Sequence, residues 1–174
     1  IQDNDLIVEM GEAIGEQCKR IGIHVNFAPV VDINVNPNNP VIGIRSFGED
    51  KELVAQKGIA YMKGLQNVHV MANAKHFPGH GDTDADSHYN LPVIKHSRSR
   101  IDSVELYPFK KLFQDSLASV MAAHLQIPAI DDRKNYATTL SPKAVTDILI
   151  KELKFEGLIF TDALNMKGVA AYHE

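Results

Sequence analysis

The sequence predicts an α/β fold with a parallel sheet, and three observations support this prediction. Segments with apolar residues at helical spacing alternate four times with short apolar runs rich in β-branched residues. Such continuous runs are typical of strands in a parallel sheet that is covered by helices on both faces. Polar side chains stand at the ends of the predicted strands, namely Asp32, His76, His124 and Asp162. The carboxyl ends of parallel strands are where α/β proteins carry their active sites.

The first predicted pair is a helix followed by a strand. Apolar side chains recur at helical spacing over residues 6–21, after the acidic cap region 3–5, and Gly22 provides a stop. Residues 24–33 are rich in β-branched and aromatic side chains, which favours a buried strand. The polar, proline-rich residues 34–40 then predict a long loop.

The same alternation predicts three further pairs. Helices are expected over residues 53–65 and 104–117, and strands over 68–76 and 118–127. The last helix begins at Ser141-Pro142, because serine caps a helix and proline suits its first turn. The final strand, residues 157–162, ends in a carboxylate.

Four units would make half of a (β/α)8 barrel. A complete barrel needs roughly 250 residues, whereas this chain has 174. The sheet is therefore either open or part of a larger barrel. At this length a single domain is expected.

Composition excludes several classes of protein. With 44% apolar and 23% charged residues, the chain has the composition of a soluble globular protein. The formal net charge of -4 argues against a nucleic-acid partner. Cys18 is the single cysteine, so no internal disulfide forms. No apolar run approaches the roughly 18 residues that span a bilayer, and the glycine-rich nucleotide-binding motifs are missing.

Residues 75–88, which read KHFPGHGDTDADSH, concentrate histidines and aspartates in one loop. A plain surface loop does not explain this density, because histidine is infrequent and titrates near neutral pH. An EF-hand calcium site is rejected, since Ser87 stands where glycine is required and Val93 where glutamate is required. Zinc or iron bound by His76, His80 and His88 remains an alternative, because ligands at this spacing can converge.

A catalytic dyad is the third interpretation of this loop. Asp86 and His88 are two residues apart, so on an extended chain their side chains lie on one side. The carboxylate would orient the imidazole and raise its pKa, which suits a general acid and base. Asp162 at the last strand end is then the candidate nucleophile.

Four blocks of sequence resemble the barrel domain of glycoside hydrolase family 3, in particular its β-N-acetylglucosaminidase branch. The blocks occur in the order of the family, at residues 26–32, 45–48, 75–88 and 160–166. The resemblance implies a (β/α)8 TIM-type barrel, of which the chain covers about the middle four units. Residues 1–174 would then be one partial catalytic domain, incomplete at both ends.

The resemblance also implies an activity, while the sequence leaves the compartment open. It implies a retaining exo-hydrolase that releases terminal β-linked N-acetylglucosamine, in bacteria often from peptidoglycan fragments, without a metal or another cofactor. A soluble protein of the bacterial cytoplasm or periplasm is expected.

Site residues follow from the resemblance position by position. Asp162 matches the nucleophile, His88 the acid/base and Asp86 the partner of that histidine. The residues that match sugar-binding positions are Arg45, Lys75 and His76. Asp32 lies near the pocket floor and either binds the sugar or holds a loop, and His124 either lines the pocket or is a core histidine. His80 and Asp82 are expected to organise the loop.

Two alternatives to a glycosidase stay open at this point. One is a carbohydrate-binding fragment without catalytic activity, and the other is a metal-dependent hydrolase that uses the histidine-rich loop. Because half of a barrel has two open sheet edges and an uncovered interior, we expect the chain to form an oligomer or to pack against the remainder of its barrel.

Overall fold

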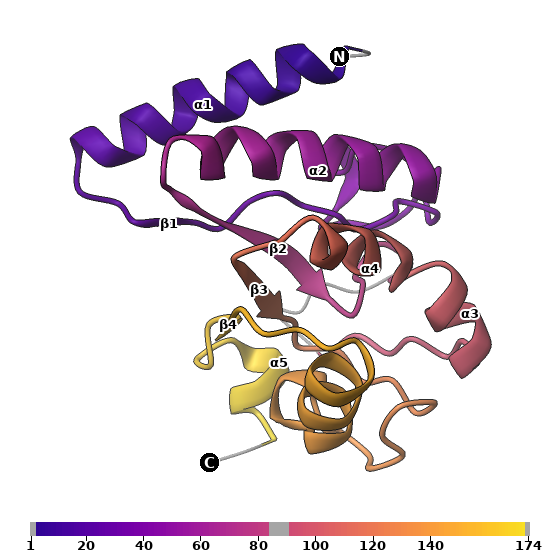
Figure 1. Ribbon diagram of the computed structural model, residues 1–174. Coiled ribbons are helices and arrows are strands. Elements are labelled where there is room, and N and C mark those ends of the chain that lie inside the picture. Colours follow the sequence, from indigo (N-terminus) through magenta and orange to yellow (C-terminus); the bar gives the residue numbers. More distant parts are fainter. Residues whose placement is uncertain (1–2, 84–90, 173–174) are drawn as a thin grey trace.

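A computed structural model describes residues 3–83 and 91–172 of the chain. Its four strands are β1 (Val25–Asn26), β2 (Met71–Phe77), β3 (Ser119–Ala122) and β4 (Leu158–Thr161), and they pair in this order. All three pairings are parallel. The sheet is curled like half of a barrel (Figure 1), so the α/β class and the partial (β/α)8 architecture predicted from the sequence are confirmed.

Helices connect the strands in the way that parallel pairing requires. The two longest, α1 (Asn4–Arg20) and α2 (Lys51–Asn67), pack side by side on one side of the sheet (Figure 1). The connection from β2 to β3 contains α3 (Arg98–Ser103) and α4 (Tyr107–Gln114).

The remaining helical segments are shorter or less regular. Between β3 and β4 lie a 3-10 turn, η2 (Thr138–Leu140), and a π-helical segment, η3 (Lys143–Glu152). Another 3-10 turn, η1 (Gly43–Arg45), follows β1, and α5 (Lys167–Ala170) follows β4.

Three predicted elements differ from those observed. The strand expected over residues 118–127 is regular only over β3, Ser119–Ala122. The first strand was expected over residues 24–33, but the regular part ends at Asn26, because Ala28 N–H folds back onto the Asn26 carbonyl and Pro29 has no N–H to donate. The extended chain nevertheless stays bonded to β2, since Val31 N–H donates to the Lys75 carbonyl at 2.8 Å. The helix expected over residues 104–117 is shortened to α4, in whose first turn Pro108 stands.

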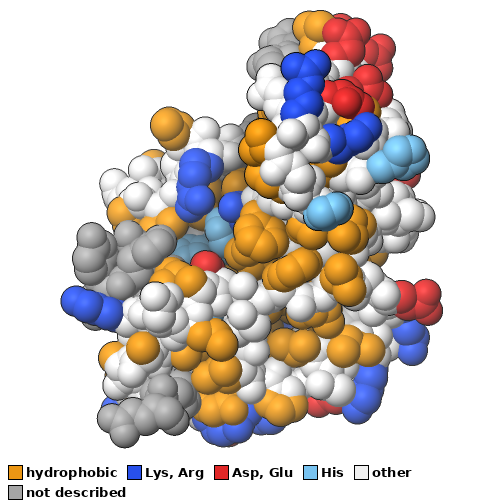
Figure 2. All heavy atoms as spheres, turned by 90° about the vertical axis from the view of Figure 1, so that its left-hand side faces the viewer, with side chains coloured by type: hydrophobic (Ala, Val, Ile, Leu, Met, Phe, Trp, Pro, Cys, Tyr) orange, Lys and Arg blue, Asp and Glu red, His pale blue; other side chains and the backbone are white. Residues whose placement is uncertain are grey.

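Apolar side chains fill the space between the sheet and its helices, and some remain exposed along the open sheet edges. Phe77, Met62 and Phe109 are almost completely buried in this core. At the edges, Phe27 after β1 is 45% exposed and Leu158 in β4 is 51% exposed. Figure 2 shows apolar side chains gathered over the middle of one face of the molecule. In the described residues no helix combines the length and the apolar character that crossing a bilayer requires.

Close contact between α1 and α2 depends on glycines that face each other. A Cβ atom on Gly64 would lie 2.3 Å from the Val8 carbonyl oxygen and 2.8 Å from the Gly11 Cα. Both neighbours are backbone atoms, so the helices can accommodate an added methyl group only by moving apart.

Substitution of Gly64 by alanine should therefore destabilise the fold, although alanine is the better helix former. Overpacking of a tight interface costs typically about 1–3 kcal/mol. We expect a loss of that size in urea unfolding, whereas Gly22→Ala, at a site with open space but a positive φ of 78°, should cost less. Equal stability of wild type and Gly64→Ala would contradict the close approach of the two helices.

Candidate active site

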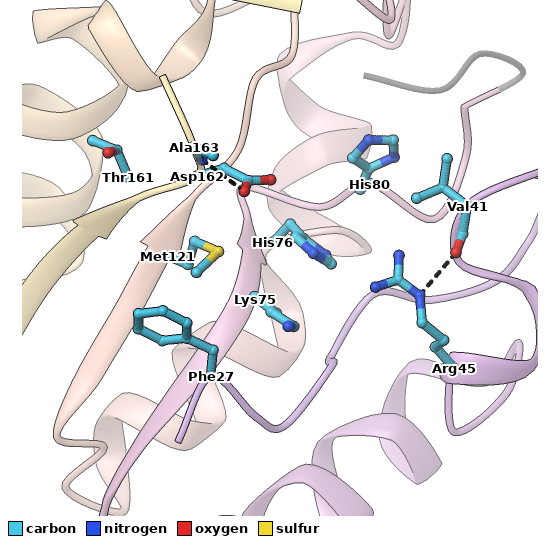
Figure 3. A pocket seen from close by; sticks show the side chains of 10 residues that line it. All are labelled: Phe27, Val41, Arg45, Lys75, His76, His80, Met121, Thr161, Asp162 and Ala163. Atoms are coloured by element: carbon cyan, nitrogen blue, oxygen red, sulfur yellow. Dashed lines mark hydrogen bonds between the residues drawn. The ribbon is translucent and has the colours of Figure 1, made fainter. Parts of the chain in front are cut away.

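A cavity of about 390 Å³ opens at the carboxyl end of the sheet (Figure 3). Side chains from all four strand ends and from the loop after β1 surround it. The lining residues are Phe27, Val41, Arg45, Lys75, His76, His80, Met121, Thr161, Asp162 and Ala163. Four residues predicted from the sequence to act in a site, Arg45, Lys75, His76 and Asp162, are thus brought together.

Asp162 stands directly after β4 and is held by backbone contacts on both sides. Its N–H donates to the Ala122 carbonyl at 3.1 Å, which continues the ladder with β3. Its Oδ1 accepts from the N–H of Ala163 at 2.8 Å. The carboxylate is half-buried and faces the cavity (Figure 3). The sheet therefore presents one carboxylate in a defined orientation.

Two cationic side chains share the cavity with this carboxylate. Lys75 comes from β2 and is half-buried; burial and the charge of Arg45 lower its pKa, while Asp162 and Asp32 act in the opposite direction. Arg45 ends the turn η1, and its Nε donates to the Val41 carbonyl at 2.8 Å. In the view of Figure 3, His76 and Lys75 lie between Asp162 and Arg45. The two cationic side chains can donate hydrogen bonds to the oxygen atoms of a ligand in the cavity.

Asp32 lies beneath the cavity and fixes His76. Its side chain is buried, and Oδ2 lies 2.6 Å from His76 Nδ1. Its Oδ1 accepts from the backbone N–H of His76 at 3.2 Å and from that of His80 at 2.7 Å. An ionised carboxylate only accepts hydrogen bonds, so His76 Nδ1 carries a proton. Asp32 is thus the residue that holds this turn, one of the two roles expected from the sequence, and it does not line the cavity.

The contacts of Asp32 keep it ionised in spite of its burial. Burial alone raises the pKa of a carboxyl group. The charge of His76, the hydrogen bond from its ring, the charge of His80 and the hydrogen bond from the His80 backbone outweigh this effect, and the pKa of Asp32 lies below its ordinary value of 3.8.

His80 belongs to the cavity wall and to the loop framework at once. Its Nδ1 lies 2.9 Å from Thr83 Oγ1, and its carbonyl accepts from Asn39 Nδ2 at 2.9 Å. Burial lowers the pKa of His80, partly offset by the charge of Asp32. Its ring is therefore neutral near pH 7. These contacts match the loop-organising role expected for it.

Asp82 takes part in a charged cluster at the base of the same loop. Its Oδ2 lies 2.5 Å from His96 Nε2, and Arg100 Nη2 lies 3.1 Å from Glu105 Oε1. Burial raises the pKa of Glu105, against the charge of Arg100. The possible metal-ligand atoms of Asp82, His96 and Glu105 lie within 4.8 Å of one another. A metal bound there would compete with the Arg100 guanidinium for both carboxylates.

The zinc or iron site considered from the sequence used a different set of ligands, His76, His80 and His88. In the structure the Nδ1 atoms of His76 and His80 are engaged by Asp32 and Thr83. Asp86 and His88, expected to form the acid/base dyad, lie outside the described residues.

His124 lies under the cavity wall, with no exposed surface. Its Nδ1 lies 2.9 Å from Thr139 Oγ1, and its Nε2 lies 3.0 Å from the Ala163 carbonyl oxygen. For His124 the sequence left pocket lining and a core position open; the side chain is not among the lining residues, and it contacts the residue that follows Asp162.

Sequence reasoning missed five wall residues of the cavity: Phe27, Val41, Met121, Thr161 and Ala163. Phe27, Met121 and Thr161 lie in segments that were predicted as strands. The signal that can find Met121 and Thr161 is alternation, because in a curled sheet every second side chain of a strand faces the interior. Phe27 follows the edge strand β1, and its ring lies 5.3 Å from that of Phe160 in the other edge strand, β4. This contact helps to hold Phe27 at the cavity.

A curled parallel sheet with a carboxylate, two cations and a histidine at its carboxyl end defines a class, the enzymes of the (β/α)8 type. Comparison with known families narrows this class. The model of the glycosyl hydrolase family 3 N-terminal domain matches residues 1–174. The chain therefore belongs to glycoside hydrolase family 3.

Individual relatives agree with this assignment. A β-hexosaminidase A of Pseudoalteromonas piscicida is 41% identical to this chain, and the match covers 94% of this chain and 29% of that protein. The structure of a glycoside hydrolase family 3 β-N-acetylglucosaminidase from Paenibacillus sp. str. FPU-7 matches with a TM-score of 0.96 and 42% identity, over 99% of this chain and 32% of that one. NagZ from Neisseria gonorrhoeae matches with a TM-score of 0.86 and 32% identity, over 94% of this chain and 47% of that one. The chain spans less than half the length of each.

Replacement of Asp32 by asparagine should test whether its charge holds the site. Asparagine removes the charge that accepts these hydrogen bonds, and hydrogen bonds to a charged group contribute about 1.5–3 kcal/mol each. Because the folded-state pKa of Asp32 is lowered, its carboxylate stabilises the fold above about pH 4, and this contribution is lost as the pH falls through that pKa.

The difference in unfolding free energy between wild type and Asp32→Asn should thus be constant between about pH 7 and pH 5 and shrink below about pH 4. Urea unfolding over a pH series measures it. Asp147→Asn, which alters an exposed carboxylate, is the control and should cost little at any pH. A deficit of Asp32→Asn that stays constant at low pH would show that charge is not its cause.

Proposed function

We propose that the chain carries the catalytic centre of a retaining exo-glycoside hydrolase that releases terminal β-linked N-acetylglucosamine. One observation carries the proposal: Asp162 shares a cavity at the carboxyl ends of the strands with Arg45, Lys75 and His76. Family membership and the β-hexosaminidase and β-N-acetylglucosaminidase names of the relatives support it.

Asp162 is the proposed nucleophile. Its Oδ1 is held by the Ala163 N–H, and Oδ2 is the oxygen we assign to the attack on the anomeric carbon. As the new C–O bond forms, the bond to the leaving group breaks, and the electron pair stays on the departing oxygen. A covalent glycosyl-enzyme results, which water later hydrolyses with net retention.

His88 is the proposed acid and base, with Asp86 as its partner. The imidazolium gives its proton to the departing oxygen in the first step and takes a proton from the attacking water in the second. Asp86 orients the ring and stabilises its charged form. A histidine suits this role because its unperturbed pKa of about 6.5 already lies near neutral pH. The turn before this pair is held by Asp32, which bonds both His76 and His80.

The cationic and neutral donors of the cavity are proposed to hold the sugar. Lys75 and Arg45 donate hydrogen bonds to hydroxyl oxygens. His76 carries its Nδ1 proton toward Asp32, so in the neutral ring Nε2 accepts a hydrogen bond. Phe27 and Met121 offer an apolar surface to the C–H groups of the pyranose ring.

Peptidoglycan fragments are the proposed natural source of the sugar. The proposal rests on the resemblance to the N-acetylglucosaminidase branch and on the likeness to NagZ. A carbohydrate-binding protein without catalysis and a metal-dependent hydrolase are the competing outcomes of the tests that follow.

Substitution of Asp162 by asparagine removes the nucleophile with little change in size. Turnover of an aryl β-N-acetylglucosaminide should fall by about 10³-fold or more, while the inhibition constant of free N-acetylglucosamine should change by less than about threefold. Steady-state kinetics of the protein expressed from its complete reading frame measures both. Retained turnover would move the nucleophile to another residue, and wild type that binds the sugar without turnover would indicate a binding protein.

Substitution of His88 by alanine should give a loss that depends on the leaving group. A disaccharide needs protonation of its departing oxygen, so its kcat/KM should fall by about 10²- to 10⁴-fold. An aryl glycoside with a good leaving group should lose less than about tenfold in the same quantity, because its departing oxygen needs no proton.

Two further measurements decide between the alternatives for His88. His69→Ala, which alters an exposed histidine before β2, is the matched control and should leave both substrates unaffected. Equal losses on both substrates in His88→Ala would contradict the acid/base role. Inactivation by a chelator with recovery on addition of zinc would instead support a metal-dependent hydrolase.

A further inference from the structure

We infer that His124 is a positioning residue for Asp162, acting through the backbone of Ala163. The inference rests on the proposed function, because it assigns a task to the residues behind the proposed nucleophile. His124 and Ala163 belong to the ends of neighbouring strands, β3 and β4. Their contact therefore joins the segment after one strand to the segment that carries the carboxylate of the next.

The protonation of His124 at this contact follows from its partner. Nε2 lies 3.0 Å from the Ala163 carbonyl oxygen, which only accepts hydrogen bonds. Nε2 therefore carries a proton and donates it, whether the ring is neutral or charged. The imidazole has no exposed surface, so the protein around it fixes where this donor lies.

Thr139 holds the other side of the ring. Its Oγ1 lies 2.9 Å from His124 Nδ1 and 2.5 Å from the Ala123 carbonyl oxygen. Thr138 Oγ1 donates to the same carbonyl at 2.7 Å. The Thr138 hydroxyl thus attaches the turn η2 to the end of β3. The single proton of the Thr139 hydroxyl goes to Nδ1 when the ring is neutral and to the Ala123 carbonyl when the ring is charged, and in both cases this hydroxyl lies against the imidazole. His124 is a rigid donor rather than a side chain free to rotate.

Ala163 transmits this rigidity to the carboxylate. Its carbonyl accepts from His124 and from the N–H of Met166 at 3.0 Å, while its own N–H donates to Asp162 Oδ1 at 2.8 Å. Both polar groups of the Ala163 backbone are therefore committed. Among the described residues β4 pairs with β3 alone. The contacts of Asp162 and Ala163 with the residues at and after the end of β3 therefore fix where the carboxylate lies.

A pair of amide substitutions separates positioning from packing. In His124→Gln the side-chain amide nitrogen can reach the place of Nε2 and donate to Ala163, whereas in His124→Asn the shorter side chain reaches only the place of Nδ1. We expect His124→Asn to lower kcat/KM for an aryl β-N-acetylglucosaminide by about 10- to 100-fold, as a displaced reacting group does. His124→Gln should recover most of that loss.

Binding provides the second readout. The inhibition constant of free N-acetylglucosamine should change by less than about threefold in both variants, because His124 does not line the cavity. A parallel loss of binding and turnover, or equal activity of the asparagine and glutamine variants, would overturn the inference and leave a packing role. Wild type without activity on the substrate would overturn the proposed function instead.

The Thr139→Val variant tests the same positioning role even if the His124 variants fail to fold. It removes the hydroxyl beside Nδ1 while keeping the side-chain shape, and kcat/KM should fall by about three- to tenfold with unchanged binding of N-acetylglucosamine. Unchanged kcat/KM in Thr139→Val would also count against the inference. His69→Asn, an exposed histidine before β2 whose φ of 64° suits asparagine, is the matched control for the same chemical change.

Discussion

The hydrogen bond between Asp32 and His76 is the interaction on which the site depends. One buried carboxylate accepts hydrogen bonds from the His76 ring, the His76 backbone and the His80 backbone. It thereby ties the end of the first strand segment to the turn that follows β2. A buried charge is stable only when its contacts replace those of water, and here three donors converge on two oxygens. The same contacts that keep Asp32 ionised set the direction of the His76 ring.

Close packing then removes the remaining freedom of that turn. A Cβ atom on Gly81 would lie 1.9 Å from the Ile33 carbonyl oxygen, so the chain after His80 runs directly against the chain after Asp32. Gly79 has a φ of 137°, a conformation open to glycine, and a Cβ there would lie 2.8 Å from the Glu105 Cβ. The glycines of the histidine-rich loop are thus explained by backbone approach. Its polar residues are the part left for binding and chemistry.

The sequence predicted the site to the extent that strand ends are recognisable. His76 and Asp162 follow from apolar runs that stop at polar residues, whereas Lys75 was assigned through the resemblance to a family, and the structure gathers all three in one cavity. Arg45 is reached only through the resemblance to a family, because it stands in a short turn without periodicity. The buried role of His124 depends on the pairing of β3 with β4 and on a turn 15 residues further along the chain. Local patterns contain no information on such contacts between distant segments.

The wall of the cavity has a cationic part and an apolar part, and this difference determines which ligands it can bind. Lys75 and Arg45 stand on the β2 and η1 side, whereas Phe27 and Met121 present apolar surface. A pyranose ring has the same division, with hydroxyl groups at its rim and C–H groups on its faces. Burial reduces the hydration of the Lys75 ammonium group and, together with the charge of Arg45, lowers its pKa. In the proposed function this donor exchanges contacts with water for contacts with sugar hydroxyl groups. The cationic and the apolar side chains of the wall therefore surround the carboxylate at the end of β4, and hydrogen bonds to the neighbouring strand β3 hold that carboxylate in place.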